Sequence, residues 1–478
     1  MSSVLNQWQR LNTLLGQLTA ALTDSNRRQA ENAATAMITC GIAGAALWLA
    51  CFYFAAEIRY VGDDFNVLRP VLHGGLTQSL HQYVRPIEYA IAFASIRSGY
   101  PLWLAVSFAL YVLTALATLS LWRMIAGQGR VPTWQVLICA ATPLIANAHF
   151  QIDTVSQALA NWFSLLLTIA VLSCMRATSA SVIARRCWLV AGAAVMCLLS
   201  KETTYGLVGC AGVLLYLAHG RRALGQVLFM GCALTACMVW SALYTFDVSV
   251  GAHYGLKNPL YWAFAVVFST AVAVVPTPTS LVLTGTAAEH GGYLLLVITG
   301  LIVAVVGFGA VAWNAVRHLR ARTQNSATWL QPIPAVLAVL FVFALMPSIF
   351  FKASELYASQ ALPLLKCLLL WPFRASASKR VSAYAVTLAL LWSVTSIVNV
   401  MFYSVATGYR ASAERTPSLL QRPVIALEPI VRKQRAHYSI YSMEGDAQVR
   451  GNCLIDSRDR SICLPRNITS GVPWLALP

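Results

Sequence analysis

The apolar run Thr35–Ala56 (TAMITCGIAGAALWLACFYFAA) is followed at once by Glu57-Ile58-Arg59-Tyr60-Val61-Gly62-Asp63-Asp64. The run is long enough to cross a bilayer as a helix, which takes about 20 mostly apolar residues. Arg59, Asp63 and Asp64 are therefore expected at or just outside a membrane face, where ionisable groups are costly and mark functional sites. A solvated loop after the first helix is the alternative interpretation.

The composition of the whole chain supports a membrane protein. Of its 478 residues, 58% are hydrophobic and only 11% are charged, whereas a soluble domain carries about 25% charged residues. We therefore predict an all-α, polytopic transmembrane bundle. The net charge of +17 is assigned to short loops that orient helices, not to nucleic-acid binding. Residues 1–34 are mixed and polar, without the pattern of a cleavable signal peptide.

Apolar runs predict about eleven spans. They cover residues 35–56, 101–125, 133–148, 157–175, 187–200, 204–218, 224–246, 292–316, 333–351, 361–373 and 381–403. We expect a cytoplasmic segment over 1–34, a transmembrane domain over 35–403 and a small outer tail over 404–478. The run 259–275 is left open. The basic cluster Arg317–Arg322 is cytoplasmic only if this run does not cross the membrane, which favours a re-entrant or interfacial excursion.

On this topology, residues 57–100 form the first outer loop. Apolar residues spaced three to four apart, from Leu68 to Ile91, predict helices lying in the membrane plane, with Pro86 between two of them. Arg59 and Arg85 are unexpected in an outer loop, because the positive-inside rule places Arg and Lys in cytoplasmic loops. We interpret them as contacts for a lipid-borne phosphate. The alternative is simple charge balance by the neighbouring acids Glu57, Asp63, Asp64 and Glu88.

Four outer segments place charged or polar residues at the ends of predicted spans. These residues are Asp63 and Asp64; Asp153; Lys201 and Glu202; and Lys352, Glu355 and Tyr357. We expect them to share one depth on one side of the membrane. A carboxylate there can act as general base on an acceptor hydroxyl, and cations can stabilise a phosphate leaving group. This chemistry suits sugar transfer from a lipid phosphate.

The motif Leu198-Leu199-Ser200-Lys201-Glu202-Thr203 is very similar to a Ser-Lys-Glu-Thr motif of GT-C type glycosyltransferases, and Ser354-Glu355-Leu356-Tyr357 resembles a later motif of the same group. Together with the acidic pair, they make the chain resemble protein O-mannosyltransferases, lipid A aminoarabinose transferases and O-antigen modifying enzymes. The resemblance implies a polyprenyl-phosphate sugar donor, Asp63 or Asp64 as the base, and Lys201 at the donor phosphate. The second loop has one acid, Asp153, where some relatives have Asp-X-Asp, so metal dependence stays open.

The resemblance also implies a setting: a bacterial cytoplasmic (inner) membrane, with the site on the periplasmic side. The acceptor would be a cell-envelope glycan such as O-antigen, a lipid or a protein. Two rival classes are a transporter or flippase of lipid-linked glycans and a scaffold without catalysis. Transport favours internal repeats and broken helices, which the sequence does not display.

Two cysteines, Cys453 and Cys463, lie in the polar tail ten residues apart. If the tail is outside, it meets an oxidising compartment, and we predict a disulfide between them. Two unpaired thiols in a cytoplasmic tail are the alternative.

Overall fold

The structure is a computed structural model, and it describes only part of the chain. The described residues are 24–55, 85–98, 100–127, 131–141, 155–244, 298, 302, 305, 333–350, 355–371, 379–406, 448–450, 453–455 and 461–463. Several predictions fall outside them. These concern Arg59, Asp63, Asp64, Asp153, Lys352, the run 259–275 and nearly all of the span predicted over 292–316.

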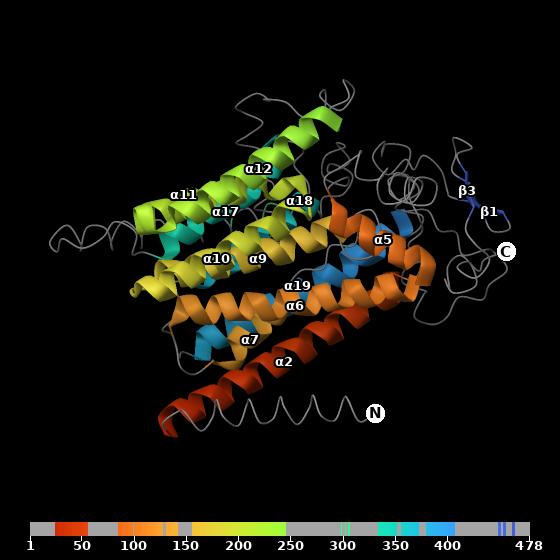
Figure 1. Ribbon diagram of the computed structural model, residues 1–478. Coiled ribbons are helices and arrows are strands. Elements are labelled where there is room, and N and C mark those ends of the chain that lie inside the picture. The colour runs from red at the N-terminus through yellow and green to blue at the C-terminus, as the bar shows by residue number, and fades with distance from the viewer. Residues whose placement is uncertain are drawn as a thin grey trace, which may run out of the picture.

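Between residues 24 and 406, every described element is helical, and the long helices run side by side as a bundle (Figure 1). The helices are α2 (Asp24–Ala55), α5 (Pro86–Ser98), α6 (Tyr100–Ala126), α7 (Thr133–Ala140), α9 (Val155–Met175), α10 (Ala180–Leu198), α11 (Tyr205–His219), α12 (Leu224–Tyr244), α17 (Ile333–Phe350), α18 (Glu355–Leu370) and α19 (Lys379–Ala406). Two short 3-10 helices are η1 (Glu202–Thr204) and η2 (Gly220–Ala223). The predicted helical bundle is therefore observed across the described part of this region.

Five described segments are long and apolar enough to cross a membrane: Glu31–Phe52, Leu104–Ala126, Val155–Met175, Ala180–Leu198 and Glu202–Leu243. The last of these contains α11 and α12, which pack against each other and are joined through Gly220. Gly220 has a φ of 55° and ends α11, a conformation that glycine adopts without strain. The count of about eleven spans stays a prediction.

The outward faces of the helices are apolar, unlike those of a soluble bundle. On α10, Val190 and Ala194 are fully buried, while Trp188, Leu189 and Met196 are exposed. Inward and outward faces thus differ in packing and not in polarity. A large exposed apolar surface of this kind marks contact with membrane lipid.

Two predicted helix starts, those of α10 and α18, are later than the observed ones. The span predicted over 187–200 begins at Ala180, because the helix continues through arginines that the apolar pattern treated as loop. Arg186 Nη1 donates a hydrogen bond of 2.5 Å to the Ser173 carbonyl at the end of α9. A long side chain can lie along the bundle while its charge finds a partner at the end. Likewise, α18 begins before its predicted span over 361–373.

The centre of the bundle is α9, which is buried along most of its length and packs against α6, α10, α11 and α18. Lys366, on α18, is also fully buried. Its Nζ donates a hydrogen bond of 3.1 Å to the Ile138 carbonyl and lies 4.7 Å from the centroid of the Trp392 ring. Ile138 lies in the last turn of α7, where carbonyls lack intrahelical donors. Lys366 thus stabilises a helix end inside the bundle.

In the tail, three short strands form an antiparallel sheet in the order β1 (Gln448–Arg450), β2 (Cys453–Ile455) and β3 (Ser461–Cys463). The prediction had assigned no strands to this region. The register makes Cys453 and Cys463 direct cross-strand partners. Directly opposed Cα atoms lie about 4.5 to 5.5 Å apart in antiparallel sheets, within the range that a disulfide spans. The backbone is therefore compatible with the predicted bridge.

Candidate functional site

The Ser-Lys-Glu-Thr segment forms a tightly bonded turn between α10 and α11. The Ser200 hydroxyl donates to the Cys197 carbonyl at 2.7 Å, and the Thr204 hydroxyl donates to the Lys201 carbonyl at 2.8 Å. Lys201 itself is extended, with φ −164° and ψ 143°, and precedes the 3-10 turn that starts at Glu202. The hydrogen bonds of Ser200 and Thr204 thus fix the backbone of Lys201 and Glu202 in the turn that follows α10.

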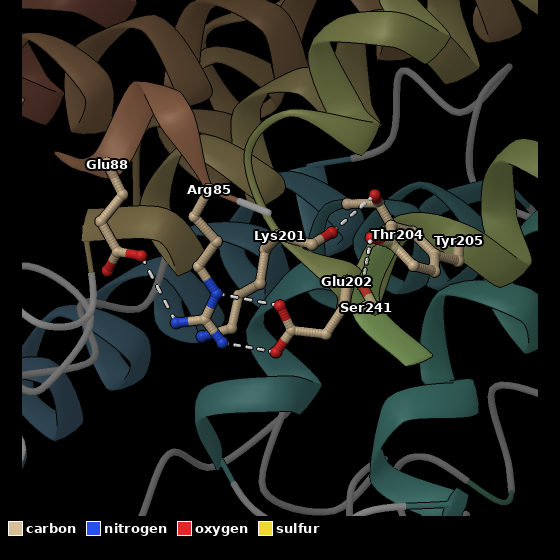
Figure 2. Close-up of polar contacts among 7 residues, drawn as sticks. All are labelled: Arg85, Glu88, Lys201, Glu202, Thr204, Tyr205 and Ser241. Atoms are coloured by element: carbon tan, nitrogen blue, oxygen red, sulfur yellow. Dashed lines mark hydrogen bonds and ion pairs between the residues drawn. The ribbon is translucent and has the colours of Figure 1, made fainter. Parts of the chain in front are cut away.

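Arg85 lies immediately before α5, which begins at Pro86, a favoured first helical residue. Its guanidinium joins two segments that are 117 residues apart in the sequence. Nε donates to Glu202 Oε2 at 2.9 Å, and Nη2 donates to Glu202 Oε1 at 2.5 Å (Figure 2). Nη1 lies 3.4 Å from Glu88 Oε2, in the first turn of α5. Such a bidentate arginine–carboxylate ion pair is both strong and geometrically specific.

The cluster is largely removed from solvent. Glu88 is 0% exposed and Lys201 is 4% exposed, whereas the side chains of Arg85 and Glu202 are 12% and 24% exposed. Figure 2 shows the Lys201 side chain running alongside the Arg85 guanidinium. Two cations therefore share a poorly hydrated site with two carboxyl groups.

The surroundings change the charge balance of this cluster. Burial raises the pKa of the Glu88 carboxyl above its ordinary value, an effect that exceeds the opposing influence of Arg85 and Lys201. For Arg85, burial acts to lower the pKa, but the Glu202 and Glu88 carboxylates outweigh it and hold the pKa well above its ordinary value. Two cationic side chains, Arg85 and Lys201, in a site with little water favour an anionic ligand.

Tyr357 on α18 connects a third predicted segment to the cluster. The Lys201 Nζ lies 5.8 Å from the centroid of the Tyr357 ring, within the range of a cation–π contact. Arg85, Lys201, Glu202 and Tyr357, which were predicted as donor contacts, are therefore brought together. Glu355 is the first residue of α18. The Arg85–Glu88 contact also fits the alternative of charge balance within the first loop.

Sequence reasoning missed two residues of interest. Glu88 was interpreted only as a balancing charge, although its position three residues after Arg85 is the spacing of a helical ion pair. Lys366 was passed over inside an apolar run, where a lone charge is itself a signal. Within the described ranges, no group of three or more His, Cys, Asp or Glu side chains is placed to hold a metal ion.

Fold and cluster together define a helical membrane protein with a buried charged site formed by α5, the α10–α11 turn and α18. Comparison with protein-family models, curated proteins and solved structures found no match to the chain.

Proposed function

We propose that the chain is an integral membrane glycosyltransferase of GT-C type. It moves a sugar from a polyprenyl-phosphate donor to a hydroxyl of a cell-envelope glycan, lipid or protein on the outer face of a bacterial inner membrane. The supporting observation is the pairing of two cations from distant segments, Arg85 and Lys201, in a site with little water. An anion gains most from cations where the local dielectric is low.

The proposed reaction uses these groups as follows. The acceptor oxygen bonds to the anomeric carbon of the sugar as the bond from that carbon to the phosphate oxygen breaks. The acceptor proton passes to the carboxylate of Asp63 or Asp64, and the phosphate keeps the electron pair. Because the phosphate gains negative charge in this step, Lys201 and Arg85 stabilise the transition state more than the ground state.

Within this proposal, Glu202 and Glu88 have a positioning role. Glu202 holds the Arg85 guanidinium through two hydrogen bonds and thereby fixes the first outer loop against the α10–α11 turn. Glu88 lies on the other side of Arg85. Neither carboxyl needs to contact the sugar.

The experiment is transfer of radiolabelled sugar from polyprenyl-phosphate donors to envelope acceptors by the purified protein in proteoliposomes. Asp63→Asn and Asp64→Asn test the base, because loss of a general base costs about 10²- to 10⁴-fold in rate. We expect at least one of the two variants to show such a loss. Full transfer by both would refute the assignment. The exposed Arg222 provides a control, Arg222→Gln, which should transfer at the parent rate.

The rival is a transporter or flippase of lipid-linked glycans, and buried Lys366 is the observation that favours it. A charge inside a membrane bundle is typical of transport pathways. The same proteoliposomes separate the two functions. A flippase moves labelled lipid between leaflets without forming a glycosylated acceptor, whereas the proposed enzyme forms that product.

A further inference from the structure

A row of amide and hydroxyl side chains joins α9 to α18 inside the bundle, and we call these five residues the polar seam. They are Gln157, Asn161, Ser164, Ser359 and Gln360. Gln157 Nε2 donates to Asn161 Oδ1 at 2.8 Å, and Asn161 Nδ2 donates to Ser359 Oγ at 2.8 Å. Gln360 Nε2 donates to Ser164 Oγ at 3.0 Å. All five residues are buried.

The seam has more hydrogen-bonding capacity than it uses between the two helices. The Oε1 atoms of Gln157 and Gln360 are buried, and neither has a hydrogen-bond partner within the described structure. A buried polar atom left in this state is costly to the fold. These two amide oxygens are therefore available to accept hydrogen bonds from a ligand.

The seam begins at the charged cluster. Ser156 lies beside the Glu88 carboxyl and acts to lower its pKa, without a hydrogen bond of normal geometry. On α18, Ser359 is two residues from Tyr357, whose ring faces Lys201. Seven residues separate Gln157 from Ser164, a rise of about 10 Å along the helix. The amides and hydroxyls of the seam therefore follow, along α9 and α18, the residues that border the charged cluster.

We propose that the polar seam binds the hydroxyl groups of the sugar carried by the polyprenyl phosphate, while Lys201 contacts the phosphate. The inference rests on the proposed function and adds the residues that recognise the sugar. Amides both donate and accept, so one side chain can serve two neighbouring hydroxyls. A buried polar site built for hydroxyls also rejects ligands that lack them, because its own groups are then left unpaired.

The test measures lipid binding to the purified full-length protein in detergent. The probes are a synthetic polyprenyl phosphate and the same lipid carrying glucose, galactose, mannose or 4-amino-arabinose. Gln157→Leu and Gln360→Leu remove the amides at nearly constant volume. Thr168→Val is the matched control, since Thr168 is equally buried on α9 but donates to the Ser164 carbonyl of its own helix at 2.9 Å.

We expect the parent to bind at least one sugar-bearing lipid about 10-fold or more tightly than the bare phosphate, a difference of about 1.4 kcal/mol. Each leucine variant should reduce this preference about 10-fold and leave binding of the bare phosphate unchanged. The valine control should keep the preference. The ratio of the two affinities is the readout, because a loss of helix packing alone would weaken both lipids together.

Other outcomes separate this inference from the proposed function. If the leucine variants still prefer the sugar-bearing lipid as strongly as the parent does, the polar seam does not recognise the sugar. The same holds if the parent itself binds both lipids equally, although the lipid phosphate can still bind at Lys201. If no polyprenyl lipid binds at all, both proposals fall. If the preference depends on Gln157 and Gln360 but no transfer occurs in proteoliposomes, the seam is upheld and the enzymatic assignment is wrong.

Discussion

Replacing Glu202 with glutamine removes the carboxylate that holds Arg85 through two hydrogen bonds. Breaking a fully buried ion pair from one side costs about 3 to 5 kcal/mol. Here the side chains of Arg85 and Glu202 are 12% and 24% exposed, so hydration offsets part of this free-energy cost. Glu88 also remains beside the Arg85 guanidinium. We therefore expect Glu202→Gln to cost about 2 kcal/mol, close to one charge-assisted hydrogen bond.

A double-mutant cycle isolates this interaction. Arg85→Gln, Glu202→Gln and the double variant are unfolded in mixed detergent–SDS micelles, and helix content is followed by circular dichroism. Arg85→Gln should cost about 3 kcal/mol, because it leaves both Glu202 and Glu88 without their cation. The double variant should cost little more than either single one, which gives a coupling energy of about 2 kcal/mol.

The exposed residue Arg222 supplies the control. Arg222→Gln should change stability by no more than about 0.5 kcal/mol. A coupling energy below about 0.5 kcal/mol between positions 85 and 202 is the result for independent sites. It would mean that the ion pair does not join the start of α5 to the α10–α11 turn. The description of the candidate site would then be wrong.

Three other changes have expected outcomes. Because burial raises the pKa of Glu88, its contribution to stability is present below the unfolded pKa, about 4.3, and is lost as pH rises through the folded pKa. The melting temperature of Glu88→Gln should thus be higher than that of the parent at pH 8, and this difference should shrink toward pH 4. A difference in melting temperature that does not change with pH would contradict this. Lys366→Met should cost about 1 to 3 kcal/mol in the same micelle titration, because the Ile138 carbonyl loses its donor; unchanged stability would argue against that role. Mass spectrometry of the unreduced protein should find Cys453 and Cys463 in one bridged peptide, and free thiols at both would exclude the disulfide.

The helical bundle was predictable because the signal for a membrane helix is local. A run of about 20 apolar residues is sufficient evidence for one span, and the helices predicted at 101–125 and 157–175 are observed close to those positions. The candidate span Glu31–Phe52 lies close to the predicted 35–56, although its helix, α2, already begins at Asp24. The start of α10 was not predictable from hydropathy, because Arg185 and Arg186 lie within the helix. A helix ends where its backbone hydrogen bonds end, and the apolar run is only a guide to that point.

The candidate site was predictable in its residue types but not in its pairing. Arg85 was singled out because it lies against the positive-inside rule in a predicted outer loop, and Lys201, Glu202 and Tyr357 because they lie at the ends of predicted spans. The Arg85–Glu202 contact joins positions 117 residues apart, and no local pattern specifies which arginine meets which carboxylate. Only the packing of α5 against α6 and α9 settles the partner.

The polar seam did leave a signal in the sequence that was overlooked. Gln157, Asn161 and Ser164 follow one another at intervals of three to four residues, which places them on one face of a helix. In an otherwise apolar span, such a stripe indicates a face that contacts either polar partners or a polar ligand. The residues on α18 that complete it, Ser359 and Gln360, carry no comparable periodicity.

The most direct test of the account is transfer of radiolabelled sugar from a polyprenyl-phosphate donor by the purified protein in proteoliposomes, compared with Lys201→Gln. We expect a labelled envelope acceptor with the parent chain, and a loss of at least about 100-fold in rate when the buried cation is removed, as for other electrostatic contacts to a developing anion. Labelled lipid that changes leaflet without any labelled acceptor, in parent and variant alike, would contradict it.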